Sequence, residues 1–348
     1  MSRIVRPLVS PIGRVTILGA ATIWLVAIMG LSPSAPESAE ATPSTTVAER
    51  VFRVEKLDGL EDPLYGAIIL TATSSGDLYV SDTGNKRVLQ LRPAADHQSV
   101  DLIQVFGSPG EGPGELRQPS GVAIDAGGNL FVADDGLGRI TKYAPDGTYL
   151  ASAQHRGVSS VVVTSKGDVL AWPGEGEALL TRYSADLTDA ESVLRKPDAG
   201  YKAWINSLFV VDSEDNLYWL DNRQLVVRVF DSELSQVGEW PIDPPGLRED
   251  AETRLEEARK VMPQANLDPI MHMDLSASGD RILLTYKMHK LGSRVVYLYT
   301  LDGELEQQWV AEGRVFGATM DPDGVLIAAD GDGLNFSVGA RTTASNAP

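Results

Sequence analysis

Short apolar runs and polar turns alternate along the chain, most clearly between residues 119 and 143. Each run is only four to six residues long, and Gly, Asn, Asp and Pro separate one run from the next. This pattern is typical of antiparallel strands joined by tight turns. The successive runs and turns are 121–124, Gly127-Gly128-Asn129, 130–133, 134–136 and 139–143.

The same unit recurs six times, and the turn position of each copy can be aligned with Gly128. Neighbouring turn positions are 39 to 64 residues apart, and four of the six copies carry an aspartate six residues after the turn. Repeats of this length with four strand-like runs each predict a β-propeller. The turn positions are Gly76, Gly128, Gly167, Asp215, Gly279 and Gly324, and the aspartates are Asp82, Asp134, Asp221 and Asp330.

The clearest copy reads P-S-G-V-A-I-D from Pro119, then G-N-L-F-V-A-D from Gly128, then R-I from Arg139. These residues resemble an NHL repeat. The resemblance implies an all-β fold, a single six-bladed propeller over residues 50–340, of the kind found in exported bacterial proteins. The repeat motif is structural and names no reaction.

Two features outside the regular strands complete the predicted ring. The sixth copy has only three strands, so we expect residues 51–57 to close the last blade, because an open ring would leave a long unpaired edge. Residues 247–263 have apolar side chains at helical spacing, with acidic residues first and basic residues last, which predicts an amphipathic helical insertion at the rim. Residues 341–348 are expected to form a disordered tail.

The N-terminus has the pattern of an export segment. Arg3, Arg6 and Arg14 precede an uncharged, mostly apolar run over 15–31. A basic flank before an apolar run predicts that the following chain lies outside the cytoplasm. Residues 1–31 are therefore expected to be a signal peptide or a signal anchor, both readings being open, followed by a flexible tether over 32–49. The propeller would then be periplasmic, or held at the inner membrane by this segment alone.

Charge and cysteine content narrow the classes of partner. The chain has 30 basic and 48 acidic side chains, of which four basic and three acidic lie in residues 1–50; the remainder has 26 against 45, a net charge of −19. So negative a body repels nucleic acid and anionic lipid. The absence of cysteine excludes disulfides and thiolate chemistry. We expect a monomer whose partner is a protein or a small molecule.

The first strand of each copy should line the central channel, as in other propellers. At that depth the titratable side chains are His272 and Asp274, and three serines occupy equivalent positions near the start of the strand (Ser120, Ser159 and Ser207). Lactonase-like propellers hold calcium there and amidating-lyase propellers hold zinc, but each site needs several converging ligands. A lone His–x–Asp favours a structural pair, so no metal, cofactor or catalytic residue is assigned. A metal-dependent lyase or hydrolase using these two residues, with calcium or zinc, is the alternative.

The loops that lead into the first strands carry an unusual set of side chains for so acidic a chain. Three arginines there suit a carboxylate or phosphate, and two aromatic rings offer stacking surfaces. The other interpretation is that each arginine pairs with a local carboxylate such as Glu115 or Glu312. We expect a binding scaffold, more readily than an enzyme, that holds a protein, glycan or small anionic ligand at the mouth. The candidate residues are Tyr65, Arg117, His155, Arg156, Trp204, His272 and Arg314.

Overall fold

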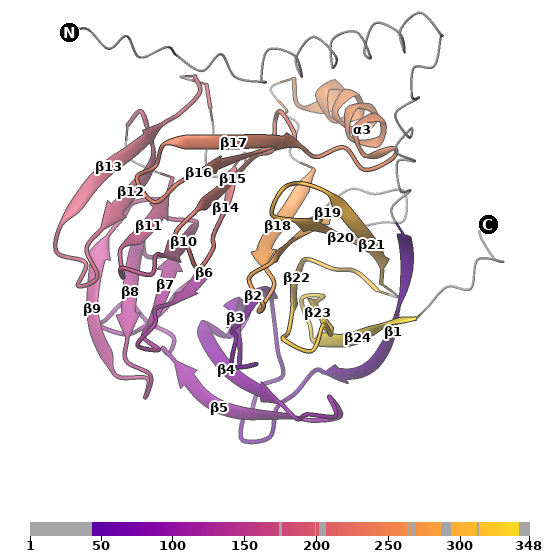
Figure 1. Ribbon diagram of the computed structural model, residues 1–348. Helices are drawn as coiled ribbons and strands as arrows, with labels where there is room; N and C mark the ends of the chain where they lie inside the picture. Colours follow the sequence, from indigo (N-terminus) through magenta and orange to yellow (C-terminus); the bar gives the residue numbers. More distant parts are fainter. Residues whose placement is uncertain are drawn as a thin grey trace, which may run out of the picture. The chain divides into compact units, whose positions relative to one another are not determined.

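The structure of the protein is a computed structural model that describes residues 44–340 except 174–175, 199, 202–206, 264, 266–268, 287–293 and 312. Within these residues the chain forms six four-stranded blades around a central axis, and Figure 1 shows the blades following one another in chain order. The predicted all-β, six-bladed propeller with one helical insertion is confirmed. The expected N-terminal segment 1–31, most of the tether and the tail 341–348 lie outside the described residues.

Each of the first five blades takes four consecutive strands, which pair in antiparallel order. Blade one contains β2 (Ala67–Ala72), β3 (Leu78–Asp82), β4 (Arg87–Pro93) and β5 (Val100–Phe106), with a short 3-10 helix at Thr83–Asn85. Blades two and three contain β6 (Pro119–Ile124), β7 (Leu130–Asp134), β8 (Arg139–Tyr143), β9 (Tyr149–Gln154), β10 (Ser160–Val163), β11 (Val169–Trp172), β12 (Ala178–Tyr183) and β13 (Ala190–Arg195). Blades four and five contain β14 (Ser207–Val211), β15 (Leu217–Asp221), β16 (Val226–Phe230), β17 (Gln236–Pro241), β18 (Ile270–Leu275), β19 (Arg281–Tyr286), β20 (Val295–Thr300) and β21 (Leu305–Val310).

Blade six is completed by a strand from the other end of the described chain, as predicted. It consists of β22 (Gly317–Met320), β23 (Leu326–Ala329), β24 (Leu334–Ala340) and β1 (Ser44–Val54). In Figure 1, β1 lies beside β24, with which it pairs antiparallel from Val47↔Ala340 to Val54↔Leu334. The first residues of β1 also pair in parallel with β21, from Ser44↔Gln307 to Val47↔Val310.

The closing strand therefore differs in extent from the predicted range 51–57. It begins at Ser44, inside the segment expected to be a tether, and it ends at Val54. The reason is that β24 continues to Ala340 and pairs with β1 back to Val47, while β21 pairs with residues 44–47. The link to β21 merges blades five and six into one eight-stranded sheet.

The repeated aspartate that marks four of the blades has a structural role. The Asp134 carboxylate is fully buried and accepts hydrogen bonds from the backbone N–H groups of Arg117 and Gln118, at 2.7 and 3.0 Å. In blade one, Asp82 accepts the N–H of Tyr65 at 2.8 Å in the same way. These bonds satisfy the backbone of a blade-to-blade loop that would otherwise be buried without partners. Asp82 and Asp134 therefore fix the loops that enter β2 and β6.

The aligned turn positions are also explained by backbone geometry. Gly128 has a φ of 79° and Asp215 a φ of 65°, both in the left-handed region. Glycine adopts this conformation without steric cost, and Asp is among the other residues that tolerate it. The hydrophobic core then lies between the blades, where clusters of buried side chains join neighbouring sheets.

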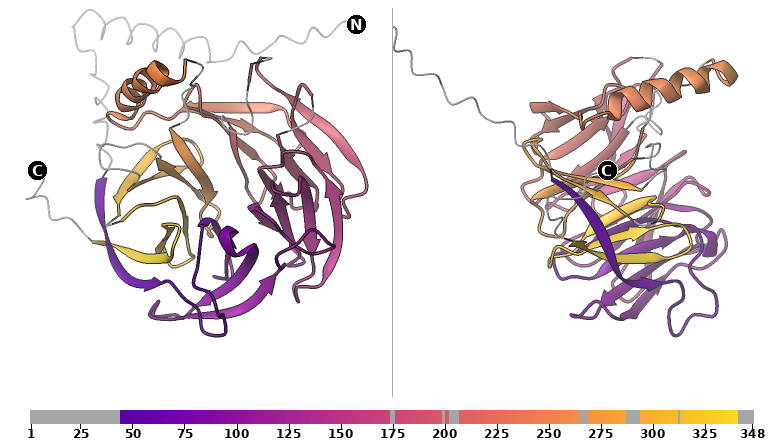
Figure 2. Two further views of the ribbon diagram at one scale, coloured as in Figure 1. Left: turned by 180° about the vertical axis from the view of Figure 1, so that it is seen from behind. Right: turned by 90° about the vertical axis from the view of Figure 1, so that its right-hand side faces the viewer.

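The predicted insertion helix is present as α3 (Leu247–Val261), which follows β17. Leu247 and Ala251 are buried in its first turns, while Val261 at its end is exposed. Figure 2 shows the helix beside the ring in two further views. Among the described residues, no helix is long and apolar enough to span a membrane.

Candidate ligand-binding channel

A cavity of about 730 Å³ occupies the middle of the ring. Its walls come from β2, β6, β10, β14 and β18 and from the turns that follow these strands. The sequence predicted that all six inner strands line the channel, but no residue of β22 is among its described lining. Residues of β22 are buried, and Thr71 of β2 reaches Asp274 of β18 directly, its hydroxyl donating to Oδ1 over 3.0 Å. The first strand of blade six therefore lies behind the channel wall.

The spacing of the inner strands depends on a glycine in β6. A Cβ atom added at Gly121 would lie 2.6 Å from the Cα of Ser160 in β10. Backbone atoms cannot move aside as the end of a flexible side chain can, so any larger residue at position 121 would push the two strands apart. Gly121 thus fixes the width of the channel between blades two and three.

The lining combines apolar walls with hydroxyl groups. Ile69, Val161 and Leu208 are among the apolar residues, and Ser120 and Ser159 lie near the start of the inner strands. No lysine or arginine is among the described residues that line the cavity. A site of this volume and composition is typical of small-molecule pockets, which hold a few polar groups in a largely apolar wall.

His272 is the first of two buried polar side chains in this wall. It belongs to β18, is only 6% exposed, and its Nδ1 has no hydrogen-bond partner among the described residues. Burial lowers the pKa of His272 to about 4, because the charged imidazolium would be poorly solvated. At neutral pH the ring is therefore uncharged and can both donate and accept a hydrogen bond.

Asp274 lies two residues further along β18, on the same side of the strand. It is 8% exposed, and its Oδ2 has no hydrogen-bond partner among the described residues, although Oδ1 accepts the Thr71 hydroxyl. Burial raises the pKa of Asp274 to about 7, against the opposing effect of hydrogen bonds from Thr319 and Thr71. The carboxyl group is thus divided between its neutral and ionised forms near neutral pH.

The donor set of the channel does not fit a metal held by several protein ligands. His272 and Asp274 supply two donors, whereas zinc sites usually have at least three. The other carboxylates of the lining are tied into turns: Asp125 accepts the N–H groups of Gly127 and Asn129, both at 2.9 Å. Within the described residues, no group of three metal-binding side chains lies in the channel.

His155, one of the predicted binding residues, lies in the protein interior. It is 1% exposed, its Nε2–H donates to the Pro173 carbonyl over 2.7 Å, and its Nδ1 is 2.8 Å from the Tyr183 hydroxyl. Both ring nitrogens are satisfied, so this histidine holds the loop before β10 against blade three.

The remaining predicted residues lie on the surface, apart from Trp204, which is outside the described residues. Arg117 is 60% exposed as a side chain and forms an ion pair with Glu111, at 3.3 Å, while Tyr65, Arg156 and Arg314 are exposed. None of these four residues is part of the cavity lining. The structure brings His272 into the channel and leaves the arginines outside it, so a shared anion site remains a prediction.

The serines of the lining could be anticipated from sequence, since Ser120, Ser159 and Ser207 occupy equivalent positions of three copies. What sequence could not show was that the carboxyl of Asp274 would face Thr71 instead of a charged partner. That contact joins residues 203 apart in the chain, and it depends on the position of β22 behind the channel wall.

The fold and its channel define a six-bladed β-propeller with a small-molecule-sized central cavity. No family model and no curated protein sequence matches the chain. Solved structures match it at 11% identity, which shows the fold alone. They include a streptogramin B lyase (81% of this chain, 96% of that chain, TM-score 0.52), the β-propeller domain of Cps50 (Swd1) from Myceliophteria thermophila (83% and 99%, TM-score 0.53) and the hydrazine synthase of Kuenenia stuttgartiensis (82% and 99%, TM-score 0.54).

Proposed function

We propose that this protein is a binding protein that holds a small, uncharged polar molecule in its central channel. The observation that supports this function is a pair of buried polar atoms, Nδ1 of His272 and Oδ2 of Asp274, that have no hydrogen-bond partner within the described part of the chain and lie on the wall of a cavity of about 730 Å³. Leaving a buried donor or acceptor unsatisfied costs about 1–3 kcal/mol. A ligand that hydrogen-bonds both atoms recovers that cost.

The chemistry of the walls favours an uncharged ligand over an anionic one. The described lining has no cationic side chain, His272 is neutral at pH 7, and Asp274 repels negative charge when ionised. The hydroxyl groups of Ser120 and Ser159 donate to the carbonyls of Ala133 and Trp172, at 3.3 and 3.2 Å, so their oxygen atoms can accept hydrogen bonds from a hydroxylated molecule. Among the ligands expected from sequence, a sugar-sized polyhydroxyl compound suits this channel better than a carboxylate or phosphate.

The same proposal includes the cellular location of the protein. The basic flank and apolar run of residues 1–31 support export, so the ligand would be met outside the cytoplasm. The repeat pattern that resembles NHL proteins supports the same assignment.

Acid–base catalysis is a second candidate, favoured by one observation. Asp274 has a pKa of about 7 and lies two residues from His272 on the same strand, so it can take up or give up a proton at physiological pH. Perturbed groups of this kind gather at catalytic sites, although they also occur in structural ones. In this reading Asp274 transfers a proton to or from the bound molecule, and His272 orients it.

A screen of matched compounds tests the proposal. Mono- and disaccharides and polyols would be compared with the corresponding sugar acids and phosphates, first by thermal shift and then by calorimetry. We expect uncharged compounds to bind, with affinity reduced more than roughly tenfold in His272→Leu and Asp274→Asn, since each loses a hydrogen bond to a buried group. Arg117→Ala, outside the cavity, is the control and should bind like the parent.

Two outcomes would reject the proposal that the channel binds an uncharged ligand. One is a set of hits whose affinity is unchanged in both channel variants. The other is selective binding of anions that is lost in Arg117→Ala, which would favour the predicted mouth site. Mass spectrometry of each bound hit after incubation separates the two candidates, because an enzyme releases a product that Asp274→Asn does not form.

A further inference from the structure

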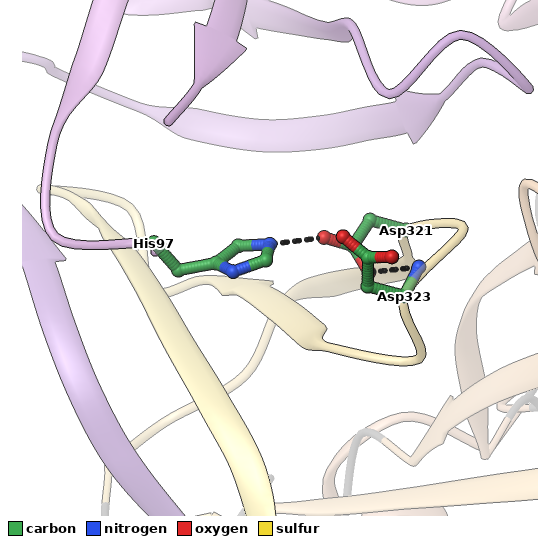
Figure 3. Close-up of side chains that lie close together, drawn as sticks. All are labelled: His97, Asp321 and Asp323. Carbon is green, nitrogen blue, oxygen red and sulfur yellow. Dashed lines mark hydrogen bonds and ion pairs between the residues drawn. The ribbon is translucent and has the colours of Figure 1, made fainter. Parts of the chain in front are cut away.

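We propose that blades six and one share a binding site for a divalent transition-metal cation, formed by His97, Asp321 and Asp323. Figure 3 shows the three side chains converging from two blades. One ligand atom from each of them, the His97 ring nitrogen and two carboxylate oxygens, lies within 4.8 Å of the others. The site is separate from the central channel, whose lining includes none of these residues.

The position of His97 in its blade is the first indication. It lies in the turn between β4 and β5 with a left-handed backbone, φ 53°. The matching turn position is Gly147 in blade two and Leu187 in blade three, also at positive φ. Leu187 is buried in the cluster that joins blades two and three, so this turn position faces the preceding blade. Blade one has an imidazole at this position, where the other blades named have either an apolar side chain or a glycine.

The turn that His97 meets differs from those of blades two and four, the other two blades in which this turn begins with an aspartate. In blade two, Asp125 uses Oδ1 for backbone N–H groups, and its Oδ2 accepts the side-chain amide of Asn129 over 2.8 Å. Asp212 and Asn216 form the same pair in blade four, at 2.9 Å. In blade six, Val325 stands in the place of the asparagine, while Asp321 keeps its backbone bonds.

The two departures meet at one point. Without the amide, Oδ2 of Asp321 faces His97 of blade one, and its distance to Nε2 is 2.6 Å. The Asp321 side chain is 4% exposed and that of His97 12% exposed, so both are held within the seam between the blades. The ring of His97 also lies against Phe336, with centroids 6.4 Å apart, which limits its rotation.

Asp323 supplies the third donor. It is exposed, and its carboxylate has no hydrogen bond or ion pair within the described part of the chain. Two carboxylates therefore lie beside one imidazole, with no lysine or arginine paired to either among the described residues. This excess of negative charge attracts a cation, and the exposure of Asp323 leaves a route for it to enter.

The ligand type indicates which cation fits. One imidazole nitrogen with two carboxylate oxygens suits zinc or a related first-row ion, with water in the open position. Binding at Nε2 requires the ring proton to reside on Nδ1, and the hydrogen bond to Asp321 is replaced by two metal–ligand bonds. With metal–ligand distances of about 2.0–2.1 Å, the separation of Nε2 and Oδ2 would open from 2.6 Å to roughly 3.3 Å. Small side-chain rotations supply this change.

Such an ion would cross-link the ring at its closing blade. His97 and Asp321 are 224 residues apart, and blade six is itself completed by the distant strand β1. Because a metal that binds the folded state stabilises it, zinc should raise the unfolding temperature of the ring.

The test uses the full-length protein stripped with a chelator and titrated with zinc chloride alone. We expect one zinc per chain by calorimetry and a rise in the thermal midpoint. His97→Leu introduces the residue that blades three and four carry at this turn, so it should fold and bind no zinc at the seam. Asp323→Asn changes an exposed residue and should weaken binding by more than roughly tenfold, since even outer-sphere changes cost about 10–100-fold.

Glu214→Gln is the matched control, because Glu214 occupies the same turn position in blade four as Asp323 in blade six. It should bind zinc like the parent. The proposal is overturned if the parent binds no stoichiometric zinc, or if His97→Leu and Asp323→Asn bind zinc as tightly as the control.

Discussion

Two histidines of this propeller are almost equally buried, yet their surroundings differ. His155 has a hydrogen-bond partner at each ring nitrogen, whereas Nδ1 of His272 has none among the described residues. His155 joins a loop to the core of blade three, and His272 lines a cavity. Because buried polar groups are normally satisfied, an unsatisfied one on a cavity wall indicates a site.

The comparison also separates stability from function. A satisfied buried histidine stabilises the fold, and removing it takes a hydrogen bond away from each of its partners. An unsatisfied one costs the fold free energy that a ligand can return. The predictions below test this difference, starting with the largest expected effect.

His155→Leu should cause the largest loss of stability. It removes the hydrogen bonds that His155 makes to the Pro173 carbonyl and to the Tyr183 hydroxyl, and the loss of each buried bond costs about 1–3 kcal/mol. We expect the free energy of unfolding in urea to fall by about 3–5 kcal/mol. Tyr183→Phe keeps the bond of His155 to the Pro173 carbonyl and removes the bond of the hydroxyl to His155 and its longer bond to the Gln154 carbonyl, 3.5 Å, so it should cost less. A loss no larger than that of the Tyr183 variant would show that the bonds of His155 contribute little.

The pH dependence of stability should distinguish the channel pair by sign. The pKa of His272 is lowered from 6.5 to about 4, so only the unfolded chain binds this proton in that window, and stability rises with pH. The pKa of Asp274 is raised from 3.8 to about 7, so the folded protein keeps a proton that the unfolded chain loses, and stability falls with pH. Between pH 4 and 6.5 the two effects oppose each other.

In each single variant, the pH dependence of stability should show the effect of the other group of the pair. Relative to the parent, Asp274→Asn should gain stability with rising pH and His272→Leu should lose it, each by about 1.4 kcal/mol per pH unit, or on the order of 3 kcal/mol across the window. Urea unfolding at half-unit steps from pH 4.5 to 7 measures both slopes. If the free energies of unfolding of the parent and both variants change with pH in parallel, burial does not shift the pKa of either group.

The sequence predicts the ring well because its repeat is local. Gly128 and Asp134 lie within one hairpin and its entry loop, so their spacing reports the turn and the loop bonds directly. The closing strand was also predicted, but not its start at Ser44, since that depends on how far β24 extends and on the pairing of residues 44–47 with β21.

The site was less predictable because its chemistry arises between blades. His155 and His272 both come just before or within an inner strand, and nothing nearby in sequence tells a satisfied ring from an unsatisfied one. The partners of His155 are 18 and 28 residues away, while Thr71, which donates to Asp274, and Asp321, which contacts His97, each lie more than 200 residues away. Such contacts follow from how the blades pack, which a repeat pattern does not encode.

His272→Leu should have a small effect on stability, and this effect should be opposite in sign to that of His155→Leu. No hydrogen bond within the described residues is lost, and an unsatisfied nitrogen is replaced by an apolar group of similar size. At pH 7 we expect the free energy of unfolding to be unchanged or to increase by about 1 kcal/mol. Stability–function trade-offs of this kind are common at binding sites. A loss above about 2 kcal/mol, in urea unfolding at pH 7, would mean that His272 is a structural residue like His155.

Arg117→Ala should have the smallest effect of all, although Arg117 also lies in a loop between blades. Its side chain forms one exposed ion pair with Glu111, and its anchoring bond to Asp134 comes from the backbone N–H, which alanine retains. Exposed pairs contribute about 0–1 kcal/mol, so we expect a change within about 0.5 kcal/mol in urea unfolding and no further change on adding Glu111→Ala. Channel binding should also be unaffected, since Arg117 is not in the lining. A tenfold loss of affinity in this variant would instead place part of the ligand at the mouth, where the sequence predicted the arginines would act.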